Sequence, residues 1–315
     1  MRPTPIYTFE KFAPTKQMEF NYVYQNSFNV DLKQSQLNQK TNPKNTFFSP
    51  IGFIAYDENN APVAFYGVYP CTMIYRGKRF LVAQSGDTMT LPEHQGKGLF
   101  TQLAKLTYEA CKFEGIHLVF GFPNENSYPG FVKRLGWTHF DNLSVYLMRV
   151  KGLAWLRLKK TFRLPQSWHT RWCQFILKRQ PKGQPFASSI TNDVHAVVDH
   201  SPDFFEYKCY GGNFLIDVNG ISVWVKFNAE YLFIGDMDVR TEADFLKVTR
   251  KLKRIARWCG LPHLRMHVSS STHYDEWFQR HGKKHNLSYP VGGIAFSEEI
   301  PLEMLKFTTA DNDTF

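Results

Sequence analysis

The stretch that decides the fold is residues 85–113, SGDTMTLPEHQGKGLFTQLAKLTYEACKF. Its first part alternates as an extended strand does, Pro92 interrupts that pattern, and Gln95–Gly98 begins a helix. The helix is predicted from an apolar stripe in steps of three and four residues, formed by Leu99, Leu103, Leu106, Ala110 and Phe113. Gly115 is placed to end it.

A strand that runs into a glycine-rich turn at the start of a helix is suited to binding phosphate. Glycines let the backbone approach a ligand closely, and the first-turn N–H groups point outward with the positive end of the helix dipole behind them. Such a site holds phosphate oxygens without a metal, and Lys97 adds a positive charge at the same place. The glycine-rich stretch therefore indicates a ligand that carries phosphate groups.

The segment Gln95–Phe100 (QGKGLF) resembles the Q/R-x-x-G-x-G/A phosphate loop of the GNAT superfamily, the acetyl-CoA-dependent N-acetyltransferases. The preceding strand, Pro92 and the following amphipathic helix fall where that family places them. The last position departs from the pattern, because Phe100 stands where the family has a small residue. We expect the Phe100 side chain to turn toward the core while its N–H faces the ligand.

A second stretch, Asn124–Trp137, resembles the family's second signature, an Asn after the fifth strand followed by a helix that ends in Leu, Gly and an aromatic residue. The resemblance covers residues 1–150 and implies acetyl-CoA as the cofactor. The residues that it assigns to the cofactor are Thr88, Met89, Thr90, Gln95, Gly96, Lys97, Gly98, Leu99, Phe100 and either Asn124 or Asn126. For the two asparagines, helix capping is an equally good explanation.

The resemblance also suggests catalytic residues. Asp87 lies on the strand before the loop, where the family often carries an acid that serves as general base, although a turn or bulge would explain this Asp equally well. The family's usual general acid is a Tyr, but its position falls on Val132 or Phe131 here. Tyr128, one turn earlier, is the nearest replacement, with a half-buried aromatic as the alternative. Glu93 and His94 are expected to face solvent.

Composition sets the class of protein. The 315 residues are enough for two domains, and 43% of them are hydrophobic. The N-terminus does not resemble a signal peptide, and no apolar run reaches the roughly 18 residues of a membrane span. The five cysteines are widely spaced and include no C-x-x-C pair, and the histidines show no ligand spacing. We therefore expect a cytoplasmic protein with reduced thiols and no metal.

The formal net charge of +10 is concentrated in one segment. Residues 151–186 contain nine Lys or Arg, no acid, and the tryptophans Trp155, Trp168 and Trp172. Three interpretations are open: short helices that pack these tryptophans between two halves, a wall of the acceptor site for a phosphorylated or nucleotide-linked substrate, or attachment to an anionic membrane surface. Packing is favoured over membrane contact, and we expect no nucleic-acid partner, because a reading helix or stacking sheet is missing.

Residues 187–315 repeat the order of elements in the first part. Strands are predicted at 214–218, 221–227 and 231–239, followed by a helix at 243–259, a strand at 264–268, a helix at 272–281 and a strand at 288–296. This predicts a degenerate second GNAT-like half. Its loop position holds Arg240-Thr241-Glu242, without glycine and with a carboxylate that repels phosphate, so we do not expect it to bind CoA.

The sequence thus predicts an α/β (α+β) protein of tandem mixed sheets flanked by helices. We expect a GNAT domain at 1–150, a basic linker at 151–186 and a degenerate GNAT-like domain at 187–315. The implied function is transfer of an acetyl group from acetyl-CoA to a primary amine of a small molecule by direct attack. The alternatives are a catalytically silent CoA-binding or interaction module, and an acyl or aminoacyl transferase that acts on cell-surface precursors.

Overall fold

The computed structural model describes residues 6–151, 165–209, 212–313 and 315, and the chain divides into two compact units. Unit 1 comprises residues 1–140 and 290–303, and unit 2 comprises residues 141–289 and 304–315. The predicted ranges were 1–150 and 187–315, so residues 141–150 and 290–303 each belong to the other unit. The expectation that Trp155 packs between two halves lies outside the described residues.

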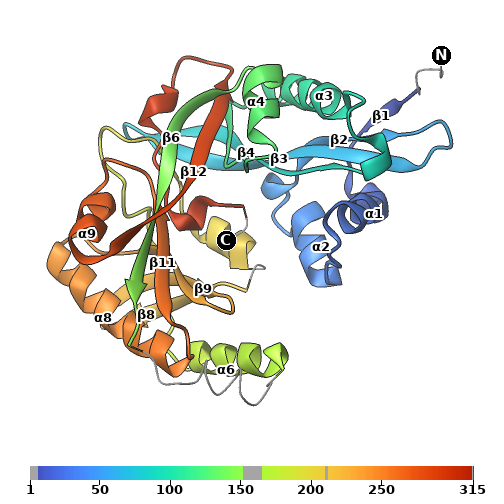
Figure 1. Cartoon of the computed structure of the whole chain (residues 1–315). Helices are drawn as coiled ribbons and strands as arrows, with labels where there is room; N and C mark the ends of the chain where they lie inside the picture. The colour runs from blue at the N-terminus through green and yellow to red at the C-terminus, as the bar shows by residue number, and fades with distance from the viewer. Residues whose placement is uncertain (1–5, 152–164, 210–211, 314) are drawn as a thin grey trace. The chain divides into compact units, whose positions relative to one another are not determined.

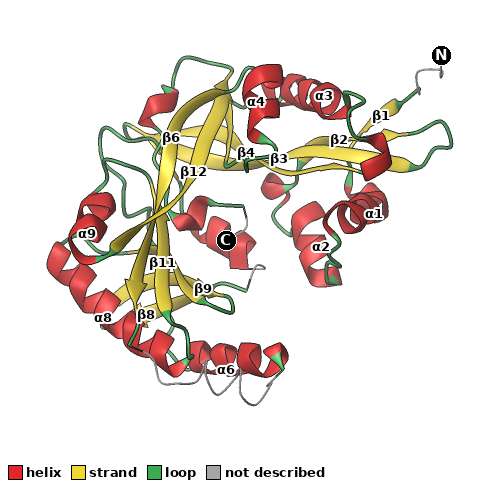
Figure 2. Ribbon diagram, in the orientation of Figure 1, coloured by secondary structure: helices red, strands yellow, loops and turns green. Residues whose placement is uncertain are grey.

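Unit 1 contains a mixed sheet with helices on both faces (Figures 1 and 2). Its strands are β1 (Thr8–Lys11), β2 (Ile51–Tyr56), β3 (Pro62–Tyr75), β4 (Lys78–Thr90), β5 (Leu118–Gly121) and the C-terminal part of β12 (Lys283–Ala295). Its helices are α1 (Gln17–Phe28), α2 (Gln34–Thr41), α3 (Leu99–Phe113) and α4 (Tyr128–Leu135). Strands β1 to β4 are antiparallel, β4 and β5 are parallel, and β12 is antiparallel to β5. In Figure 1, α3 and α4 cover one face of this sheet and α1 and α2 the other.

Unit 2 also contains a mixed sheet, in the order β12-β6-β11-β10-β9-β8, to which β12 contributes Lys283–Tyr289. The bounds of its strands are β6 (Thr138–Arg149), β8 (Phe214–Val218), β9 (Ile221–Phe227), β10 (Tyr231–Met237) and β11 (His263–Val268), with a short β7 (Val197–Val198). Its helices are α6 (Gln166–Lys178), α7 (Pro202–Lys208), α8 (Glu242–Trp258) and α9 (His273–His281). Strands β8, β9 and β10 are antiparallel, β10 and β11 are parallel, and β6 is antiparallel to β11. The predicted fold class, mixed sheets flanked by helices, is confirmed.

The sheet of each unit is closed by a strand whose sequence position belongs with the other half of the chain. In unit 1, β5 pairs with Gly292–Ala295 of β12, near the end of the sequence. In unit 2, β11 pairs with Ser144–Arg149 of β6, which the sequence predicts as the closing strand of the first half. A strand's own residues determine which face is buried but not which distant strand it joins.

Two apolar faces differ from their prediction. In α3 the side chains of Leu106 and Phe113 are exposed, the latter by 92%, because Thr107 and Tyr108 lie on the buried face instead. The hydroxyl of Thr107 donates to the Leu103 carbonyl at 2.9 Å, so a polar residue is accommodated there. In α6, Trp168 is 66% exposed, and the buried side chains of the helix are His169, Cys173 and Leu177. Trp172 is 41% exposed, and its Nε1 donates to the carbonyl of Trp258 at 2.8 Å. None of the described helices is both long and apolar enough to cross a membrane.

Candidate active site

A cavity of about 570 Å³ in unit 1 brings together the end of β4, the glycine-rich turn, the start of α3 and the start of α4. The predicted residues that line it are Thr88, Met89, Thr90, Gln95, Gly96, Gly98, Leu99, Phe100 and Asn126. The predicted residues Lys97, Asn124, Asp87 and Tyr128 are not among the lining residues. The lining contains no Asp or Glu, so the cavity is electrostatically suited to an anion.

The glycine-rich turn leaves the first turn of α3 without a side-chain cap. Gly96 and Gly98 have φ of 75° and 81°, a left-handed conformation that side chains other than glycine rarely adopt. Gly98 is the N-cap residue of α3 and supplies no side-chain hydrogen bond, and the first turn of the helix holds no acidic residue. The amides of this turn are therefore directed into a cavity with the dipole of α3 behind them.

Phe100 packs as the sequence predicts. Its ring lies edge-on against Phe131, with 5.1 Å between centroids, and against Tyr66 at 6.0 Å. Gly130 in α4 makes this possible, because a Cβ there would lie 3.1 Å from the Phe100 ring. The bulky residue at the end of the loop is therefore accommodated by a missing side chain on the neighbouring helix.

A β-bulge in β4 lies next to the cavity. Phe65 pairs with Met89 and Gly67 with Gly86, so two residues of β4 face one residue of β3. One of the two is Asp87, whose φ of 51° is unusual for a residue other than glycine. The bulge lies directly before Thr88, Met89 and Thr90, which line the cavity, and Met89 and Thr90 remain paired with β3.

Asp87 is held by two neighbours. Its Oδ2 accepts hydrogen bonds from the ammonium of Lys40 in α2, at 2.6 Å, and from the hydroxyl of Tyr69 in β3. The Lys40 ammonium also lies 5.3 Å from the centre of the Tyr69 ring. Among the described residues, Oδ1 of Asp87 makes no hydrogen bond. The bulge that the sequence left open as an explanation for Asp87 is thus present, together with an ion pair.

The other predicted residues have mostly local contacts. Oδ1 of Asn124 accepts from the backbone N–H groups of Asn126 and Ser127, both at 3.0 Å, so Asn124 stabilises the turn before α4. Tyr128 is half-buried, packs edge-on against the ring of His139, and does not line the cavity.

The sequence interpretation missed the cations of the cavity. Lys133 and Arg134 line it from the C-terminal half of α4, and His94 lines it from the turn before the loop. His94 was expected to face solvent, but it is only half-exposed and its Nδ1 lies 2.9 Å from the hydroxyl of Tyr7. Helical spacing was the available signal, because Pro129 and Lys133 are four residues apart and share one face of α4.

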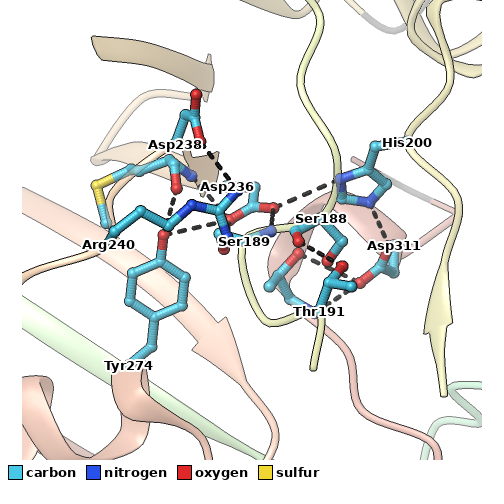
Figure 3. A network of polar contacts seen from close by, with 11 residues as sticks. Ser188, Ser189, Thr191, His200, Asp236, Asp238, Arg240, Tyr274 and Asp311 are labelled. Carbon is cyan, nitrogen blue, oxygen red and sulfur yellow. Dashed lines mark hydrogen bonds and ion pairs between the residues drawn. The ribbon is translucent and has the colours of Figure 1, made fainter. Parts of the chain in front are cut away.

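A second polar cluster is buried in unit 2 (Figure 3). His200 lies between two carboxylates, with Nε2 at 2.8 Å from Asp311 Oδ1 and Nδ1 at 3.4 Å from Asp236 Oδ2. Asp236 also accepts from the backbone N–H of Ser189 at 3.1 Å and from the hydroxyl of Tyr274 at 3.3 Å. All of these side chains are at most 3% exposed. The sequence pattern did not predict this cluster, and its burial favours a structural role.

Comparisons with known proteins agree with this geometry. Residues 13–140 match the profile of a family described as Acetyltransferase (GNAT) domain. Similar solved structures include a probable N-acyltransferase of Enterococcus faecalis V583, with a TM-score of 0.61 and 12% identity over 92% of this chain and 73% of that one. A GCN5-related N-acetyltransferase of Kribbella flavida has a TM-score of 0.60 and 11% identity over 93% of this chain and 71% of that one. A comparison with curated protein sequences found no match.

Residues 13–140 are therefore similar to a GNAT acetyltransferase domain, as the phosphate-loop resemblance predicted. A GNAT acetyltransferase domain takes its acyl group from a CoA thioester, which agrees with the predicted cofactor, acetyl-CoA. The solved structures share the fold over nearly the whole chain, but the family profile ends at residue 140. The GNAT-like nature of the second half thus stays a prediction.

Proposed function

We propose that this protein is an N-acetyltransferase that moves the acetyl group of acetyl-CoA to a primary amine of a small molecule by direct attack, without a covalent enzyme intermediate. One observation carries the proposal. The uncapped N-terminus of α3 opens into a cavity that holds Lys133 and Arg134 and no carboxylate. That combination fits a diphosphate, which the family's donor carries.

The residues of the cavity have distinct roles in holding the donor. The backbone N–H groups from Gly96 to Phe100 bind the diphosphate, and Lys133 and Arg134 add charge-assisted hydrogen bonds from the opposite side. Thr88, Met89 and Thr90 follow the bulge, and their backbone groups bind the pantetheine arm and polarise the thioester carbonyl. When bound, acetyl-CoA supplies an activated acetyl thioester whose transfer to an amine leaves the CoA thiol.

Proton transfer falls to residues of β4 and α4. Asp87 accepts the proton that the acceptor amine loses, directly or through water, at the Oδ1 atom, which Lys40 and Tyr69 do not engage. Tyr128 is the candidate donor of a proton to the departing thiolate. A thiolate is also a tolerable leaving group without such a donor, so Tyr128 contributes less than Asp87.

The catalytically silent CoA-binding module is the second candidate, and two observations favour it. Oδ2 of Asp87 is engaged by Lys40 and Tyr69, as in a purely structural ion pair. Both Asp87 and Tyr128 lie outside the cavity lining. Such a module would bind the donor at the same loop and release no thiol.

The experiment is measurement of thiol release from acetyl-CoA across a panel of primary amines, with calorimetry of CoA binding alongside. The proposal expects amine-dependent release that falls about 100-fold in Asp87→Asn, within the range for loss of a general base. Glu93→Gln is the matched control, because Glu93 is an exposed acid close to the loop and does not line the cavity. Binding without release identifies the silent module, and absence of binding contradicts both candidates.

A cytoplasmic location belongs to this proposal. All five cysteines are free, and four of them are buried, in agreement with a reducing compartment.

A further inference from the structure

A second cavity, in unit 2, has a lining rich in cations. Its volume is about 660 Å³, within the range of small-molecule sites. Arg149, Lys283 and Lys284 line it together with the imidazoles of His263 and His285. No Asp or Glu is among the lining residues. Glycine, leucine, valine and proline complete the wall, so the cavity combines a cationic rim with an apolar surface.

The topology of unit 2 assembles these cations at one end of its sheet. Strand β6 ends at Arg149, and the antiparallel strand β11 begins at His263, which is the cross-strand partner of Arg149. Strand β12, the neighbour of β6 on the other side, begins at Lys283. Three basic positions that are distant in sequence thus lie at the same edge.

This arrangement is electrostatically unfavourable without an anion. Three cations, Arg149, Lys283 and Lys284, line the same cavity and repel one another. Burial, and then the charge of Arg149, lowers the pKa of His263, while the carboxylate of Glu230 raises it, so both charged groups are close enough to His263 to interact with it. Within the described residues, none of Arg149, Lys283 and Lys284 pairs with a carboxylate.

We propose that this cavity is a binding site for a small molecule that carries a phosphate or diphosphate group. Arg149 and the two lysines bind the phosphate oxygens, and Leu147, Leu261 and Pro262 contact the rest of the ligand. The site is separate from the α3 cavity, shares no residue with it, and does not depend on the acetyltransferase proposal.

The test is calorimetric titration of inorganic pyrophosphate into the full chain at fixed ionic strength. The variant R149Q/K283Q/K284Q should weaken one binding event at least tenfold, and it should fold normally because all three side chains are exposed. The control K247Q/R250Q/R254Q removes the same charge from the exposed face of α8 and should change that affinity less than twofold. Circular dichroism confirms that each variant is folded.

The variant K133Q/R134Q separates this site from the α3 cavity, where pyrophosphate is also expected to bind. Loss of all binding in K133Q/R134Q alone would overturn the second site and leave the acetyltransferase proposal intact. Equal weakening by the two triple variants would show unspecific attraction and overturn it as well. A short single-stranded oligonucleotide that competes for Arg149, Lys283 and Lys284 and binds more tightly than pyrophosphate would overturn the assignment to a small ligand.

Discussion

Each unit has a bulged strand that is followed by a helix and then by a strand parallel to it: β4, α3 and β5 in unit 1, and β10, α8 and β11 in unit 2. The surroundings of the two bulges differ. In unit 1 the bulge in β4 contains Asp87, and the strand beyond it lines a cavity. In unit 2 the bulge in β10 lies at Gly235, next to the fully buried Asp236. There the space is filled, because a Cβ at Gly235 would lie 2.5 Å from Cε1 of Phe315.

The helices that follow these two strands, α3 and α8, also differ in whether their N-terminus is open to a ligand. The N-cap of α3 is Gly98, which supplies no side-chain hydrogen bond. The N-cap of α8 is Thr241, whose hydroxyl accepts from the backbone N–H of Asp244 at 3.2 Å. Glu242 and Asp244 add negative charge to the first turn of α8. A helix that caps its own amides and surrounds them with carboxylates does not bind phosphate, so the same order of elements gives a binding site in one unit and closed packing in the other.

The largest effect on stability is expected at His200, which lies beside Asp236 at the bulge of unit 2. Replacement of His200 by Ala leaves Asp236 and Asp311 as buried carboxylates without their shared cation. Loss of one partner from a buried ion pair costs about 3–5 kcal/mol. Urea denaturation at pH 6 should show a loss of this size. A loss below about 1 kcal/mol would contradict the view that the cluster is a structural element of unit 2.

The same residue predicts a pH dependence of stability. Burial lowers the pKa of His200, but the carboxylates of Asp311 and Asp236 outweigh burial and raise it to about 9. Because this value exceeds the unfolded value of about 6.5, the stabilisation is fully present below about pH 6.5 and is lost as the pH rises through about 9. The total is about 3 kcal/mol. His200→Gln keeps a polar side chain that does not titrate, so the difference in unfolding free energy between wild type and this variant should shrink over that range.

The next largest effect is expected on acetyl-CoA binding at the glycine-rich turn of unit 1. The double variant Gly96→Ala/Gly98→Ala should weaken acetyl-CoA binding and lower kcat/KM about 100-fold, because two backbone hydrogen bonds to phosphate, each worth about 1.5 kcal/mol, are lost. Gly77→Ala is the matched control, since Gly77 has a φ of 74° in the β3–β4 turn, does not line the cavity and has no atom near its missing Cβ. It carries the same strain of about 1–2 kcal/mol per residue in the left-handed region. If Gly77→Ala impairs binding equally, the loop is not the site.

The local sequence was sufficient to predict the glycine-rich turn, α3 and the hydrophobic strands. Glycine, proline and apolar periodicity influence the backbone over only a few residues, so they can be interpreted without knowledge of distant contacts. Helix α8 was predicted at residues 243–259 and is found at Glu242–Trp258. The closing strands were predicted as strands, but their partners were not, since β6 joins β11 and β12 joins β5 across long stretches of sequence. Register and partner depend on distant packing that no local pattern encodes.

The parts of the α3 cavity that are formed by backbone groups could be predicted from the sequence. The loop and the end of β4 could be assigned from glycine spacing, whereas Lys133 and Arg134 could not, because their role depends on how α4 lies beside the loop. The ion pair of Asp87 with Lys40 was also invisible, since 47 residues separate the two in sequence. Side chains that reach a site from separate elements are determined by tertiary packing.

A smaller effect is expected at the filled bulge itself. Gly235→Ala places a methyl group against the ring of Phe315, so packing must shift at a cost of about 1–3 kcal/mol. Thermal or urea unfolding measures the loss, which a second change, Phe315→Leu, should partly restore by removing the ring. Failure of Phe315→Leu to restore stability would mean that the bulge is not filled by this side chain.

The smallest effect tests a glycine of unit 1, Gly130 in α4, which accommodates the ring of Phe100. Alanine in the middle of a helix is favoured over glycine by about 0.5–1 kcal/mol, but in Gly130→Ala the new Cβ lies 3.1 Å from the Phe100 ring. The two terms should nearly cancel in the wild-type background. In a Phe100→Ala background the contact is absent, so Gly130→Ala should stabilise the protein by the full helix term. A double-mutant cycle therefore predicts a coupling of about 1 kcal/mol between residues 100 and 130. Strict additivity would show that Gly130 is not needed to place the Phe100 ring beside the loop.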